Sequence, residues 1–238
     1  MERQPWANDL SEILQHGLDL VHHDTGAKRR LALVVVDNFV ELLIKTYLSL
    51  PSRLTGVKLG RKRFEEVSER FPSLLDALEE HAGNKLDGVS LAEIEWYHQL
   101  RNQLYHNGVG LTVERNQVET YAELARLLFH HLLGYEIDVQ PERDTRQLGS
   151  FLETWARLET VLRNAYTTRR ERVNDYQLIY SPELVSALGE RTANELKDLR
   201  HLRNRVVHGE VNYRQALTPE HVSRLQAIVQ EIENILTG

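Results

Sequence analysis

Two arginine–histidine pairs in similar surroundings are the residues of this sequence best suited to chemistry. The first lies in segment 100–108, LRNQLYHNG, and the second in segment 202–209, LRNRVVHG. Each segment has a Leu-Arg-Asn triplet, a short apolar stretch, a histidine and a nearby glycine. Arginine offers phosphate a planar fork of N–H donors, and histidine transfers protons near neutral pH. Phosphoryl transfer can use these groups without a metal ion.

The spacing alone is weak evidence, because the chain is rich in arginine and contains 11 histidines. Roughly one such pair is expected by chance. Arg126 and His131 have the same spacing, and we interpret them as coincidental. The two motif pairs stand out only because their surroundings also match.

Each motif is predicted to occupy the last two turns of a helix. Capping boxes at Ser90-Leu91-Ala92-Glu93 and Thr192-Ala193-Asn194-Glu195 begin eleven residues before each motif arginine. Gly108 and Gly209 suit the left-handed conformation in which helices often end. Further helices open at 111–114 and 217–220. Cap, motif, glycine and following helix recur in order, which predicts an internal duplication.

Helical periodicity places both motif arginines on or beside a packing face. The apolar stripes of the two helices are Ile94, Tyr97, Leu100, Leu104 and Leu196, Leu199, Leu202, Val206. A buried guanidinium needs an anion or acceptor. The alternative to a chemical role is therefore an arginine bound to a carboxylate and a histidine capping its helix. The asparagine and histidine of each motif are four residues apart and share a neighbouring face.

Composition is that of an ordinary globular protein, with 41% hydrophobic and 27% charged residues. The absence of cysteine excludes disulfides, thiolate metal sites and cysteine nucleophiles. Residues 1–140 hold 15 basic and 21 acidic side chains, and residues 141–238 hold 14 of each. The resulting net charge of −6 argues against a protein that coats nucleic acid.

Metal and membrane sites are not expected. The adjacent histidines at 22–23 and 130–131 point about 100° apart on a helix and do not converge on one ion. No Gly-rich phosphate loop is present, and no cofactor is predicted. The N-terminus lacks an apolar leader, and Asp37 and Glu41 interrupt the most apolar stretch. We expect a cytoplasmic protein without membrane contact.

The chain reads as all-α, with two tandem helical bundles at 1–140 and 141–238 separated near Pro141. Helices are predicted at 8–23, 27–50, 61–81 (broken before Pro72), 91–106, 114–133, 145–171, 182–189, 193–208 and 219–236. Residues 176–180 are interpreted as loop.

The sequence Arg-Asn-x-x-x-His, at 101–106 and again at 203–208 in an all-helical chain, resembles the signature of HEPN domains. Many members of that family are metal-independent endoribonucleases in toxin–antitoxin, abortive-infection and other anti-phage systems. In these, two domains bring their motifs together in one composite site. Others have lost catalysis and act as interaction or nucleotide-binding modules. The resemblance implies an intrachain pseudo-dimer of HEPN-like domains.

The resemblance also implies roles for the motif residues. His106 and His208 would be the general acid and base, in an order the sequence leaves open. Arg101 and Arg203 would bind the scissile phosphate, and Asn102 and Asn204 would orient the histidines or the phosphate. The RNA 2′-hydroxyl would be the nucleophile, giving a 2′,3′-cyclic phosphate and a 5′-hydroxyl.

Two features depart from the family pattern. The branch silenced by a nucleotidyltransferase partner has a tyrosine two residues after the motif histidine, where this chain has Gly108 and Glu210. The first half is also net acidic, which is unfavourable for an RNA-binding face.

The sequence allows more than one function. The alternative function is a catalytically silent helical module that binds a nucleotide or a protein partner, and a third is a scaffold that dimerises through apolar helices. A toxic enzyme needs an inhibitor or a trigger protein, which the sequence does not identify. It also leaves open the RNA target and whether one chain or a homodimer forms the site.

Overall fold

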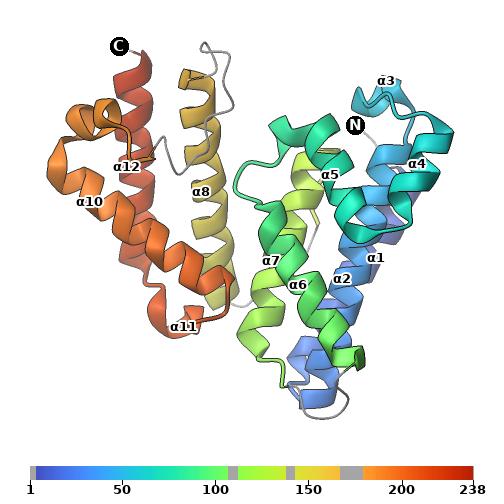
Figure 1. Ribbon diagram of the computed structural model, residues 1–238. Coiled ribbons are helices and arrows are strands. Elements are labelled where there is room, and N and C mark those ends of the chain that lie inside the picture. Colours follow the sequence, from blue (N-terminus) through green and yellow to red (C-terminus); the bar gives the residue numbers. More distant parts are fainter. Residues whose placement is uncertain (1–3, 107–111, 138–142, 167–178, 238) are drawn as a thin grey trace. The chain divides into compact units, whose positions relative to one another are not determined.

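The computed structural model describes residues 4–106, 112–137, 143–166 and 179–237 (Figure 1). All regular secondary structure in these residues is helical, which confirms the all-α prediction. The chain divides into two compact units, Met1–Gln140 and Pro141–Gly238. Within the described residues, no helix combines the length and apolarity needed to cross a membrane. The predicted pseudo-dimer of the two units stays a prediction.

The first unit is built around a long helical hairpin. Helices α1 (Pro5–His22) and α2 (Gly26–Ser49) pack side by side, and α7 (Arg115–Leu133) packs against both (Figure 1). The close approach of α1 to α2 depends on Gly17, where a Cβ atom would come within 3.2 Å of the Val36 side chain. Phe39 and Phe129 meet in the core with ring centroids 6.0 Å apart. Burial of this apolar interface is the main stabilising contribution.

The remaining helices of the first unit cover α2. Helix α6 (Leu91–His106) carries the first motif and contacts α2, as does α5 (Phe71–Ala82). Helix α4 (Arg61–Ser68) packs on α5, and α3 (Ser52–Thr55) with the 3₁₀ turn η1 (Gly83–Lys85) complete the unit. The motif helix is thus held against the long central helix of its unit.

Three long helices form most of the described part of the second unit. Helix α12 (Pro219–Thr237) packs against α8 (Arg143–Tyr166) and against α10 (Pro182–Val207), which carries the second motif (Figure 1). The short helix α11 (Tyr213–Ala216) connects α10 and α12. Fully buried apolar side chains fill the space between the helices: Phe151, Leu158, Leu162, Leu196, Leu225, Ile228 and Ile232. An ion pair between Arg157 and Glu233 joins α8 to α12 at the surface.

Most predicted helices are observed within a few residues of their expected ends. Helix α6 has the predicted bounds, and the break expected before Pro72 separates α4 from α5. The short helices α3 and α11 and the turn η1 were not predicted. The predicted end of the 145–171 helix and most of the 176–180 loop lie outside the described residues.

The predicted start of the second motif helix is wrong. The break predicted between segments 182–189 and 193–208 is observed as a kink at Gly189 (φ 76°, ψ 152°) that joins two arms of α10, but the second arm begins at residue 190 and not at 193. Because the helix resumes directly after this glycine, Thr192 lies inside it and does not cap its N-terminus. Glu195 instead pairs with Arg191 in the same helix and with Arg224 of α12.

Candidate functional site

Helix α6 presents the first motif at its C-terminal end. The helix begins directly after Ser90, whose carbonyl accepts the N–H groups of Glu93 and Ile94 at 3.1 Å each. Ile94 and Tyr97 are fully buried, as their apolar stripe predicts. The helix ends at His106, whose side chain lies outside the described residues.

Arg101 is anchored by a buried carboxylate from the central helix of the unit. Its Nε lies 3.3 Å from Oδ2 of Asp37, an α2 residue with no exposed surface. Its Nη1 donates to Asn102 Oδ1 at 2.9 Å. The arginine side chain nevertheless keeps 25% of its surface exposed. Asn102 therefore helps to orient the motif arginine. The expected role of Asn102, to orient the histidines or the phosphate, stays a prediction.

Asp37 also interacts with two other polar side chains. The Tyr121 hydroxyl of α7 donates to Oδ1 at 3.0 Å, and His98 Nδ1 lies 3.0 Å from Oδ2. Burial raises the pKa of Tyr121 well above 10, and the charge of Asp37 raises it further. Tyr121 therefore stays protonated and keeps donating. Charge-assisted hydrogen bonds of this kind are stronger than neutral ones.

Aromatic packing holds the donors of Asp37 in place. The His98 ring stacks on Phe71 of α5 at a centroid distance of 3.9 Å. The Tyr121 ring stacks on Tyr97 at 4.3 Å. Side chains from α2, α5, α6 and α7 thus fix the face of α6 that carries Arg101.

The role of Asp37 was not predicted from the sequence, in which this residue is only an interruption of an apolar stretch. The signal was present. Asp37 lies among the buried positions Leu33, Val36, Val40 and Ile44 of one helix. A single carboxylate within an apolar helical face requires buried donors. The identity of those donors, 61 and 84 residues further along the chain, had no local signature.

The second motif meets different surroundings. Arg203 is buried, with only 5% of its surface exposed, on the face that packs toward the unit's core. Asn204 and His208 remain partly exposed. The His208 N–H donates to the Asn204 carbonyl at 2.9 Å, and Gly209, with φ 67°, follows it as predicted. At this helix end, Asn204 and His208 are therefore partly accessible, whereas Arg203 is buried.

Of the six predicted site residues, the structure brings Arg101 into contact with Asn102, and it places Asn204 one helical turn from His208. The convergence of the two sets on one site stays a prediction.

The Arg126–His131 pair does not form a comparable site. Arg126 pairs with Glu123 at 3.0 Å and with Glu136 at 3.6 Å. His130 Nδ1 lies 2.9 Å from Glu136 as well. Arg126 is thus part of a structural ion-pair network at the end of α7. Among the described residues, no three His, Cys, Asp or Glu side chains cluster in a way that could hold a metal ion.

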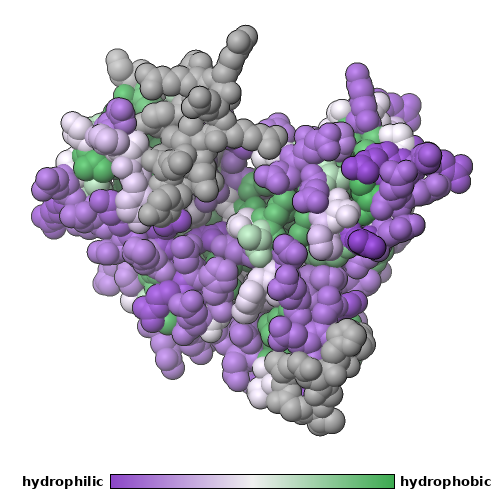
Figure 2. Space-filling model, viewed as in Figure 1, coloured by the Kyte–Doolittle hydropathy of each residue, from purple (hydrophilic) through white to green (hydrophobic). Residues whose placement is uncertain are grey.

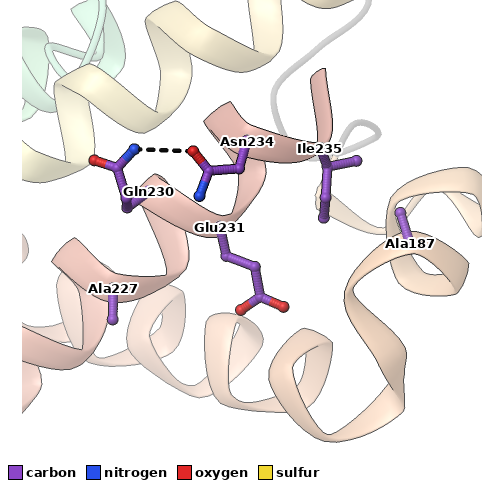
Figure 3. A pocket seen from close by; sticks show the side chains of 6 residues that line it. All are labelled: Ala187, Ala227, Gln230, Glu231, Asn234 and Ile235. Atoms are coloured by element: carbon purple, nitrogen blue, oxygen red, sulfur yellow. Dashed lines mark hydrogen bonds between the residues drawn. The ribbon is translucent and has the colours of Figure 1, made fainter. Parts of the chain in front are cut away.

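An open, shallow recess lies between α12 and the part of α10 before Gly189, lined by Ala187, Ala227, Gln230, Glu231, Asn234 and Ile235 (Figure 3). Gln230 donates to Asn234 at 3.2 Å across its rim. None of the motif residues lines this recess, and it offers no cluster of catalytic groups.

Comparison with known proteins yields no matching family model, no matching curated protein and no matching solved structure. The function is therefore inferred from the residues and their geometry.

Proposed function

We propose that the protein is a metal-independent endoribonuclease of the HEPN type that acts as a toxin or as an anti-phage effector. The observation that carries this proposal is the repeated Arg-Asn-x-x-x-His sequence at the ends of two helices. In the first copy, the arginine is oriented by a buried carboxylate while a quarter of its surface stays exposed. A fixed, accessible guanidinium is suited to a phosphate group.

The proposed reaction uses only groups of the protein and of RNA. One histidine, His106 or His208, removes the proton from the 2′-hydroxyl, and the oxygen attacks the adjacent phosphorus. The bond from phosphorus to the 5′-oxygen breaks, and the other histidine protonates that leaving oxygen. The products are a 2′,3′-cyclic phosphate and a 5′-hydroxyl. Arg101 and Arg203 stabilise the charge that develops on the phosphoryl oxygens.

Asp37 serves this mechanism as a positioning residue. It forms an ion pair with the guanidinium, whose Nη1 donates a hydrogen bond to Asn102 Oδ1, so the arginine is held in place before substrate arrives. A preoriented donor avoids reorganisation when charge develops in the transition state.

A second candidate function is a catalytically silent module that binds a nucleotide or a protein partner. The burial of Arg203 favours this alternative, since an arginine with 5% exposure is poorly placed to meet a phosphate. The ion pair between Arg101 and Asp37 also suits an arginine that only secures its helix. In this alternative, the motifs stabilise the two units and the histidines are dispensable for binding.

RNA cleavage in the presence of EDTA separates the two candidates. We expect His106→Ala and His208→Ala each to lower the rate by roughly 100-fold or more. His16→Ala, which removes an exposed histidine of α1, is the control and should leave the rate unchanged. Cleavage that needs a divalent metal, or that survives both motif substitutions, would refute the mechanism. A wild-type protein that binds nucleotide or protein and never cleaves RNA would establish the alternative.

A further inference from the structure

A basic and aromatic surface adjoins the second motif. Tyr180 directly precedes Ser181, the residue that caps the N-terminus of α10. Lys197 Nζ lies 5.3 Å from the centroid of the Tyr180 ring, and Arg200 Cζ lies 5.7 Å from it. All three side chains are partly exposed.

The kink at Gly189 creates this arrangement. In a straight helix, residues 180 and 197 would be separated by about 26 Å along the axis. The left-handed φ of 76° at Gly189 folds the first arm of α10 back, so that Tyr180 meets the middle of the second arm. Glycine is the residue that adopts this conformation without strain.

Lys197 and Arg200 continue the face of the helix that carries the motif. The positions 197, 200, 204 and 208 are three or four residues apart, and such positions lie on one side of a helix. Asn204 and His208 therefore follow Lys197 and Arg200 in a stripe about 16 Å long. The Tyr180 ring lies at the start of this stripe and His208 lies at its end.

The charge of this stretch contrasts with that of the whole chain. Residues 197–208 contain four Lys or Arg and one Asp, a net charge of +3, in a chain whose net charge is −6. The corresponding stretch of the first copy, residues 95–106, contains one Arg and one Glu and is neutral. Glu95 and His98 occupy the places of Lys197 and Arg200, and His98 is bound to Asp37.

We propose that Tyr180, Lys197 and Arg200 form a subsite for single-stranded RNA, which guides the strand toward Asn204 and His208. A base stacks on the tyrosine ring, while the two cations bind phosphates. Stacking by a base outweighs a partly exposed cation–ring contact, so the exchange is favourable. A single strand fits because its bases are open to stacking, whereas those of a duplex are not. The direction toward His208 rests on the ribonuclease function proposed above.

Equilibrium binding of a short fluorescein-labelled 2′-O-methyl RNA tests the subsite. This probe lacks the 2′-hydroxyl nucleophile, so binding by the full chain is measured without turnover. We expect Tyr180→Ala to raise the Kd about tenfold and Tyr180→Phe to leave it unchanged. Lys197→Gln/Arg200→Gln should flatten the dependence of log K on log salt by about 1.4, the amount expected for two phosphate contacts on a single strand.

The matched control removes two charges elsewhere. Arg61→Gln/Lys62→Gln alters two exposed basic residues of α4, and it should change neither the Kd nor the salt slope beyond a small general effect. Circular dichroism establishes that each variant keeps its helices. The subsite is refuted if Tyr180→Ala binds like wild type, if the α4 variant loses as much affinity, or if duplex RNA or poly-glutamate competes as well as single strands.

The two proposals fail in different ways. A protein that binds the probe through Tyr180 and never cleaves RNA would refute the ribonuclease and retain the subsite. A protein that cleaves RNA with the same KM and Kd after Tyr180→Ala would refute the subsite and retain the ribonuclease.

Discussion

Helices α6 and α10 end in the same Arg-Asn-x-x-x-His sequence, but their arginines occupy unlike environments. Arg101 is a quarter exposed and is anchored to the buried Asp37 of α2, whereas Arg203 keeps only 5% of its surface exposed. In both copies, the shared motif lies in the last turns of a helix. Packing against different partners then decided how accessible each guanidinium is.

The turns that precede the two motifs differ in the opposite way: the turn in α6 is packed inward, and the turn in α10 is more exposed. In α6, the turn before the motif faces inward through His98, which binds Asp37 and stacks on Phe71. In α10, the equivalent turn carries Arg200 and Lys197 beside the Tyr180 ring. The turn before the first motif therefore packs against the rest of its unit, whereas the turn before the second motif carries charged side chains that are partly exposed.

Polar residues cover most of the face shown in Figure 2, and hydrophobic residues appear there in separate, smaller areas. The large hydrophobic residues that are exposed include Leu31, Leu42, Leu54, Ile235 and Leu236. Of these five residues, Ile235 alone lines the recess between α10 and α12. The surface of α10 beside the second motif therefore differs from the rest of the described surface in its charge and aromatic contacts, and not in exposed apolar residues.

The largest expected effect concerns whether the two motifs act as one site. If His106 and His208 serve as the acid and base of one reaction, each alanine variant should lose roughly 100-fold or more, and the double variant should lose little further. Two independent sites would behave otherwise, because each single variant would retain about half of the rate. Initial rates of RNA cleavage for the four proteins in the cycle decide between them.

The anchor of the first motif should matter strongly for stability. Asp37→Ala removes a buried carboxylate that serves Arg101, His98 and Tyr121, and we expect it to cost about 3 kcal/mol of unfolding free energy. Asp19→Ala, at an exposed position of α1, should cost less than about 0.5 kcal/mol. Urea denaturation of both variants measures the difference. Equal stability of the two would mean that the Asp37 network contributes little to the fold.

Removal of one donor from this network should have a smaller effect with a distinctive pH dependence. Tyr121→Phe loses a hydrogen bond to a buried carboxylate, which we expect to cost about 1.5 kcal/mol at neutral pH. Because burial raises the pKa of Tyr121 above 10, only the unfolded chain loses this proton just above pH 10, and wild-type stability falls there. Tyr121→Phe should lack that part of the alkaline loss. Denaturation curves between pH 8 and pH 11 would reveal parallel slopes if this assignment were wrong.

The smallest effect is expected in the second unit, at the ion pair between Glu195 of α10 and Arg224 of α12. Hydrogen bonding from Arg224 lowers the pKa of Glu195 below 4.5, so its stabilising contribution is present above that pH and is lost as the pH falls through the lowered value. Glu195→Gln should remove this acid dependence and change stability at neutral pH only slightly, because the pair is exposed to solvent. Thermal unfolding at pH 3 and pH 7 measures both. A large loss at pH 7 would contradict the comparison with Asp37.

Local sequence determined where most helices lie. The apolar periodicity of residues 91–106, together with Ser90 before them, specifies α6. Gly134, with φ 70°, ends α7 where its apolar pattern stops. At Thr192, the capping-box pattern predicted a helix start that is not observed. A capping box is a short signal, and the helix already begins again directly after Gly189. Such local signals suffice when the hydrogen bonds that they describe lie within one turn.

Tertiary structure alone decided what surrounds the two motifs. Asp37 meets Arg101, His98 and Tyr121 only because α2, α6 and α7 pack together, and Tyr180 meets Lys197 only because Gly189 turns the chain back. These contacts join residues that are far apart in the sequence, and their energies depend on burial. Helical periodicity identifies the face on which each residue lies, whereas the partner on the opposite face is set by how the helices pack.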